Sequence, residues 1–124
     1  MTTDLQTLLS QPPASFAWSQ SEDGSRTIGT CPGCGVDIWP DRVAVAALMP
    51  SDDAALVDRN SVLLLLILSA LRPDWITAGD WLKTQMGMAA RSKEGVYEGP
   101  NYSRGVTFGW SRKTSTATLK VKTK

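Results

Sequence analysis

A chain of 124 residues can bury a hydrophobic core, and a composition of 42% apolar and 20% charged residues excludes wholesale disorder. The complete lack of histidine excludes Ser-His and Cys-His nucleophile pairs and every histidine-containing metal site. Since P-loop, G-x-G-x-x-G and G-x-S-x-G motifs are also missing, we do not expect an enzyme and assign no catalytic residue.

The net charge of +1 hides an uneven distribution along the chain. Residues 1–71 hold three basic and eight acidic side chains, whereas residues 72–124 hold ten basic and four acidic side chains. A basic half is typical of proteins that meet phosphate groups or an acidic partner. The first residues show no basic segment followed by a long apolar one, so we expect a cytoplasmic protein.

The first fifty residues are expected to form a small β-rich lobe. Leucines at 5, 8 and 9 predict a short helix that ends at Pro12-Pro13. Alternation at Phe16 and Trp18, followed by a polar turn over residues 22–25, predicts a β-hairpin. Residues 35–40 look like a further strand, and residues 42–48 fit either a strand or a short helix.

The sequence Cys31-Pro32-Gly33-Cys34-Gly35 resembles the metal-binding knuckle of zinc ribbons and rubredoxin-like proteins. The resemblance implies Cys31 and Cys34 as metal ligands and zinc as the metal. Because structural zinc has four ligands, the site would be shared between two chains or completed by Asp37 or Asp41. Two other interpretations stay open, namely a redox dithiol or disulfide and a pair of idle thiols.

The ten residues VLLLLILSAL at 62–71 are the most apolar stretch of the chain. They are too few for a membrane span, so we expect a buried core helix and no membrane partner. Ser51 and the acidic pair Asp52-Asp53 predict a helix start just before this stretch, while Pro73 predicts its end.

Residues 77–93 resemble the helix-turn-helix of winged-helix proteins. Thr77 and Asp80 have the spacing of a capping box, Gly87 predicts the turn, and a short second helix is expected through Lys93. The leucine helix would be the first helix of that fold. Gly95 and Gly99-Pro100 come early for a recognition helix, which departs from the family pattern.

The chain ends in an alternating pattern that predicts a β-hairpin in the position of the wing. Val106, Phe108 and Trp110 are expected to share one face with Ala117, Leu119 and Val121. No acidic residue follows Tyr102, and the exposed positions are rich in lysine and arginine. The residues expected to contact nucleic acid are Arg91, Lys93, Arg104, Arg112, Lys113, Lys120 and Lys122.

Together these patterns predict an α+β protein with a β-rich lobe at 1–50, which carries the knuckle, and a winged-helix-like helical domain at 51–124, which ends in the hairpin. The leading functional hypothesis is a small DNA-binding or transcription-associated protein that is a homodimer through the knuckle or the leucine helix. The alternative is a phage- or plasmid-type inhibitor that binds a host nucleic-acid-processing protein. Interface candidates among the five tryptophans are Trp18, Trp39 and Trp110.

Overall fold

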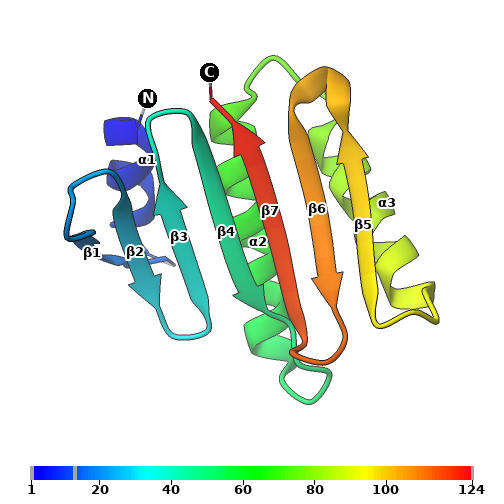
Figure 1. The fold of residues 1–124 in the computed structure, drawn as a ribbon. Helices are drawn as coiled ribbons and strands as arrows, with labels where there is room; N and C mark the ends of the chain where they lie inside the picture. Colours follow the sequence, from blue (N-terminus) through cyan, green and yellow to red (C-terminus); the bar gives the residue numbers. More distant parts are fainter. Residues whose placement is uncertain (1, 13, 124) are drawn as a thin grey trace.

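The computed structural model describes residues 2–12 and 14–123, with side chains from Leu5 onward. After the short N-terminal helix come four strands, then two long helices, then three more strands (Figure 1). In chain order the elements are α1 (Thr2–Leu9), β1 (Ala17–Gln20), β2 (Thr27–Cys31), β3 (Cys34–Ile38), β4 (Arg42–Leu48), α2 (Ala54–Leu71), α3 (Ala78–Arg91), β5 (Val96–Asn101), the 3-10 turn η1 (Tyr102–Arg104), β6 (Val106–Ser111) and β7 (Thr116–Lys122).

The strands form one seven-stranded antiparallel sheet in the order β1-β2-β3-β4-β7-β6-β5. All three helices cover the same face, so the opposite face of the sheet is open (Figure 1). The predicted fold class, a small lobe followed by a winged-helix-like core, is therefore wrong. Strands from both sides of residue 50 share this sheet, because β7 pairs with β4 across the middle of the molecule.

Alternating side chains explain why the sheet has one covered and one open face. Along β4, Val43, Val45 and Ala47 are buried, whereas the residues between them are more exposed. The predicted hairpin at the C-terminus is confirmed, including its face: Val106 lies opposite Val121, and Trp110 opposite Ala117. It is not a wing, however, since it forms interior strands of the sheet.

Helix α2 is a single helix that supplies the largest part of the cover. Its N-cap is Asp53, whose carboxylate accepts a hydrogen bond from the Leu56 amide at 3.0 Å, whereas Ser51 lies outside the helix. Length and composition would let it cross a membrane, a property that core helices of soluble proteins share. Here its apolar side packs onto the sheet through Leu63, Leu64, Ile67, Leu68 and Leu71.

One polar side chain of α2, Asn60, is fully buried and holds the helix to the β2–β3 turn and to the end of β4. Its amide nitrogen donates to the carbonyl oxygens of Gly33 at 3.1 Å and Leu48 at 2.8 Å. Its amide oxygen accepts from the Arg59 guanidinium at 2.8 Å, and Arg59 also donates to the Pro32 carbonyl. A buried amide with all these partners fixes α2 to the β2–β3 turn.

The predicted helix-turn-helix is absent, because α3 continues from Ala78 to Arg91 without a turn at Gly87. A glycine inside a helix costs only about 1 kcal/mol relative to alanine, which the burial of Leu82 and Ala89 outweighs. The next element along the chain is not a recognition helix but the edge strand β5. Pro100 is tolerated there because an edge strand need not donate every backbone hydrogen bond.

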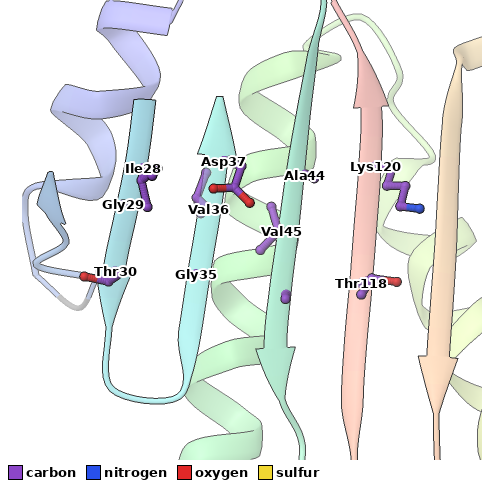
Figure 2. A pocket seen from close by; sticks show the side chains of 11 residues that line it. Ile28, Gly29, Thr30, Gly35, Val36, Asp37, Ala44, Val45, Thr118 and Lys120 are labelled. Carbon is purple, nitrogen blue, oxygen red and sulfur yellow. The ribbon is translucent and has the colours of Figure 1, made fainter. Parts of the chain in front are cut away.

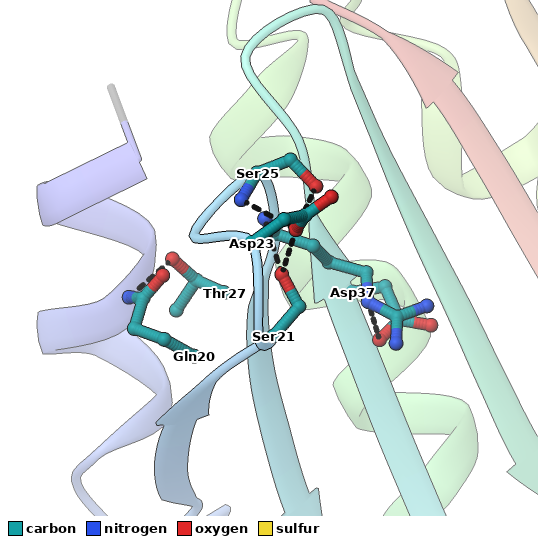
Figure 3. A network of polar contacts seen from close by, with 7 residues as sticks. Gln20, Ser21, Asp23, Ser25, Thr27 and Asp37 are labelled. Carbon is teal, nitrogen blue, oxygen red and sulfur yellow. Dashed lines mark hydrogen bonds and ion pairs between the residues drawn. The ribbon is translucent and has the colours of Figure 1, made fainter.

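The polar turn between β1 and β2 is organised by Asp23 (Figure 3). Its carboxylate accepts hydrogen bonds from the hydroxyls of Ser21 at 2.9 Å and Ser25 at 2.7 Å and from the Ser25 amide at 3.0 Å. These bonds, chiefly those from Ser25, favour the charged form and lower the pKa of Asp23 from 3.8 to about 2.

We expect Asn60→Leu to lower the free energy of unfolding by about 1–3 kcal/mol, because the Leu48 carbonyl and the Arg59 guanidinium lose a buried partner. Urea denaturation measures this change. The control is Asp58→Asn, an exposed position on the same helix, which should change stability by less than about 0.5 kcal/mol. Equal stability of both variants would contradict the role given to Asn60.

We expect Asp23→Asn to destabilise the protein at neutral pH but not in strong acid. Since the folded-state pKa is depressed, the contribution of the carboxylate is present above pH 3.8 and disappears as the pH falls through about 2. Denaturation of both proteins over this pH range measures the difference. Glu22→Gln, a neighbouring exposed position, should show no such pH-dependent difference. A difference as large at pH 2 as at neutral pH would refute the assignment.

Candidate nucleic-acid interface

The seven basic residues predicted to contact nucleic acid lie at two opposite ends of the sheet. Lys120 and Lys122 lie at the C-terminal end of β7, and Arg104 ends the adjacent turn η1. Arg112 and Lys113 precede β7, at the far end of the same strand (Figure 1). Along β7, Lys120 lies about 13 Å and Lys122 about 20 Å from Thr116, where the strand begins.

The second group, at the far end, also includes Arg91 and Lys93. The Arg112 guanidinium donates to the Ser92 carbonyl, and the Arg112 amide donates to the Gly95 carbonyl at 2.8 Å. These bonds tie the β6–β7 turn to the segment that follows α3. Arg112 therefore has a structural role there, and Arg91 and Lys93 flank the same segment.

The first group is joined by a residue from the acidic half of the sequence, Arg42. In the β4–β7 pair, Arg42 lies directly opposite Lys122, and Ala44 lies opposite Lys120. Residues two apart on a strand share a face, so all three cations lie on the open face of the sheet. We call Arg42, Lys120 and Lys122 the basic patch.

Little negative charge balances the basic patch. Asp41 is in an ion pair with Arg42 at 3.0 Å, and Asp74 lies 3.6 Å from Arg104. Neither Lys120 nor Lys122 has an ion-pair partner in the part of the chain that the structure describes. Like charges placed directly opposite each other on neighbouring strands destabilise a sheet. Asp41 offsets part of the charge of Arg42, and a bound anion would offset that of the two lysines.

The backbone beneath the patch is held rigid by Arg72. Its Nε donates to the Arg104 carbonyl at 2.8 Å, its Nη1 to the Leu71 carbonyl at 2.9 Å, and its Nη2 to the Lys122 carbonyl. One guanidinium thus joins the end of α2, the turn η1 and the end of β7. These contacts fix the positions from which Lys122 and Arg104 present their side chains.

Two aromatic side chains border the patch. Tyr102, in η1, is 89% exposed and lines a hollow of about 270 Å³ together with Arg42, Lys120 and Lys122. Trp39, in the β3–β4 turn, is covered by the Arg42 guanidinium at 4.1 Å from its ring centroid and by that of Arg26 at 5.6 Å. Arg42 is thereby held in place by a cation–π contact, whereas Tyr102 is free to stack.

Next to the patch, the centre of the open face is lined by small side chains (Figure 2). Gly35, Ala44, Ala46 and Thr118 line a shallow hollow of about 300 Å³, with Lys120 at one side. On the other side Asp37 is paired with Arg26 at 3.7 Å. Because Gly35, Ala44 and Ala46 carry no long side chain, an extended molecule can lie close to the sheet beside Lys120, with Ile28 at the far side of the hollow.

The two predicted metal ligands lie far from this patch, at the opposite end of the β2–β3 hairpin. Cys31 and Cys34 are direct partners in the register, and Cys34 is buried on the helix-covered face. Burial, followed by the nearby Cys31, raises the pKa of Cys34 to about 12, despite the opposing charge of Arg59.

The carboxylates expected to complete the zinc site do not lie near these sulfurs. Asp37 is three residues beyond Cys34 on β3 and so faces the open side. Asp41 is in the turn at the other end of β3. Among the described residues no group of three or more metal-binding side chains comes together. A zinc ion shared between two chains stays a prediction.

The tryptophans proposed as interface anchors differ in placement. Trp18 packs on the core, stacks with Phe16 and donates its indole N–H to the Ser10 hydroxyl at 2.9 Å. Trp110 also packs on the core, against the covered face. Trp39 alone of the three is at the open face, and its ring is occupied by arginines.

Sequence reasoning missed Arg42 and Tyr102 as parts of this site. Arg42 was counted with the acidic half, because nothing local shows that β4 pairs with a strand more than seventy residues later. The alternation that begins at Arg42 was the one available signal, since it puts the arginine on the face opposite Val43. No sequence pattern singles out Tyr102, since it follows Gly99-Pro100, a pair that predicts a break in regular structure.

No protein-family model matches the chain, and no curated protein or solved structure matches it either. The functional assignment therefore depends on the chain's own residues and their geometry.

Proposed function

We propose that this protein binds nucleic acid through its phosphate backbone, at the basic patch on the open face of the sheet. The observation that carries the proposal is the register of β4 and β7, which sets Arg42 opposite Lys122 with Lys120 two residues away. The Cα atoms of residues placed in this way are about 5–7 Å apart. That is within the Debye length of about 10 Å at 0.1 M salt, so the charges repel one another.

The repulsion between each pair of cations is modest, on the order of 0.5 kcal/mol at this separation in water. A phosphate bound between two such cations attracts both, so the net electrostatic interaction becomes favourable. Neutralising phosphates also releases the counterions condensed on a nucleic acid, which supplies most of sequence-independent affinity. Tyr102 adds an exposed ring on which a base can stack. The patch has few groups suited to reading base edges, so we expect little sequence preference.

The alternative function, inhibition of a nucleic-acid-processing protein by direct binding, is supported by a different surface. On the helix layer Val62 is 50% exposed and Leu65 40%, and Ile76 beyond the end of α2 is 95% exposed. Exposed apolar groups of this kind can anchor a protein interface. We prefer the nucleic-acid proposal because the register of β4 and β7 brings the cations Arg42, Lys120 and Lys122 together.

We expect Lys120→Glu/Lys122→Glu to weaken binding of a labelled oligonucleotide by on the order of tenfold or more and to lower the salt slope by about 2. Fluorescence anisotropy at several salt concentrations, with single-stranded and duplex probes, measures both. The matched control Lys93→Glu/Lys113→Glu makes the same charge change at the other end of the molecule and should bind nearly as the native protein does.

Two results would overturn the proposal. Undetectable binding by the native protein at low salt would exclude nucleic acid as the ligand and favour the protein-binding function. An equal loss of affinity in both double variants would show that net charge, not the basic patch, determines binding. Circular dichroism of each variant establishes that the sheet is intact before affinities are compared.

A further inference from the structure

The two cysteines stand on either side of a two-residue turn. Cys31 is the last residue of β2, Cys34 is the first residue of β3, and the two are direct partners in the antiparallel register. Pro32 and Gly33 connect them, and Gly33 has a φ of +78°, as the third position of a type II turn requires. The turn thus brings the two cysteine backbones face to face.

The register of this turn gives a Cα separation of the kind that disulfides span. Directly opposed residues in an antiparallel pair have Cα atoms roughly 4.5–5.5 Å apart, and their side chains leave the sheet on the same face. Disulfides span Cα separations of about 4.4–6.8 Å. Both cysteines are free thiols in this structure.

The turn is held in this shape by contacts from outside the hairpin. The Gly33 carbonyl accepts hydrogen bonds from the Asn60 amide at 3.1 Å and from the backbone amide of Leu48 at 2.8 Å. The Arg59 guanidinium donates to the Pro32 carbonyl. Because these contacts involve only backbone oxygens of the turn, joining the two sulfurs disturbs none of them.

The two thiols differ in access to solvent. Cys34 is 7% exposed and belongs to the hydrophobic core, whereas Cys31 is only partly buried at the edge of that core. A reagent from solution therefore meets Cys31 first. Cys34 is reached only from its neighbour.

We propose that Cys31 and Cys34 form a reversible intramolecular disulfide, in which Cys31 reacts first with a small-molecule disulfide and Cys34 then resolves the product. In the first step the Cys31 thiolate attacks one sulfur of the reagent, the S–S bond of the reagent breaks, and one small thiol is released. In the second step the Cys34 sulfur attacks that of Cys31, the mixed S–S bond breaks, and the proton of Cys34 passes to the departing sulfur, which leaves as the second small thiol.

The exchange is balanced, because two protein thiols are oxidised to one disulfide while one external disulfide is reduced to two thiols. Oxidised glutathione is the suitable probe for this chemical class. The site is independent of the basic patch, which lies on β4 and β7, at the other end of the sheet and on its opposite face. Its test therefore needs no nucleic acid.

The experiment incubates the reduced native protein with mixtures of oxidised and reduced glutathione, followed by acid quenching and intact-mass analysis. We expect the native protein to lose two hydrogens without forming a disulfide between two chains. Cys34→Ser should stop at a stable mixed disulfide on Cys31. Cys31→Ser should react at a rate lower by on the order of tenfold or more, because its one thiol is buried.

A second measurement covers the case in which a serine variant fails to fold. Brief alkylation of the reduced native protein, followed by peptide mass analysis, should label Cys31 well before Cys34. Three results would overturn the proposal: a native protein that stays a dithiol or a mixed disulfide under oxidising conditions, oxidation that yields only linked dimers, or equal alkylation of both cysteines in the folded native protein.

Discussion

The antiparallel pairing of β4 with β7 is the contact on which the rest of this structure depends. It joins a meander of four strands from the first part of the chain to one of three strands from the end. On the covered face it aligns Val43 with Val121 and Val45 with Leu119, which gives α2 a continuous apolar surface to pack on. Without this pairing α2 would have no single sheet to cover, and its fully buried leucines would be exposed.

The same pairing creates the surface to which we assign function. Because side chains alternate along a strand, the register that buries Val43 and Val121 also places Arg42 and Lys122 together on the open face. The stability gained from apolar contacts on one face is thus coupled to the repulsion between cations on the other. Arg72, which links α2, η1 and β7 through backbone carbonyls, holds this end of the sheet in place.

Local patterns predicted several elements correctly, among them α1, the hairpin of β1 and β2, and the face of the C-terminal hairpin. The errors came from contacts that local patterns do not encode. Gly87 and Gly99-Pro100 suggested breaks, but tertiary packing keeps α3 continuous and an edge position accommodates Pro100 in β5. Within the candidate site, Lys120, Lys122 and Arg104 were predicted, whereas Arg42 was missed, since its place beside Lys122 follows from strand pairing alone.

Nuclear magnetic resonance of the labelled protein, with and without an oligonucleotide at low salt, tests the central claim most directly. Cross-strand contacts between Ala44 and Lys120 should establish the β4–β7 register, and addition of the oligonucleotide should shift the amide signals around Arg42, Lys120 and Lys122. Signals of the β6–β7 turn at Arg112 and Lys113 should stay unchanged. Missing β4–β7 contacts would contradict the fold, and shifts confined to the β6–β7 turn or the helices would contradict the assigned site.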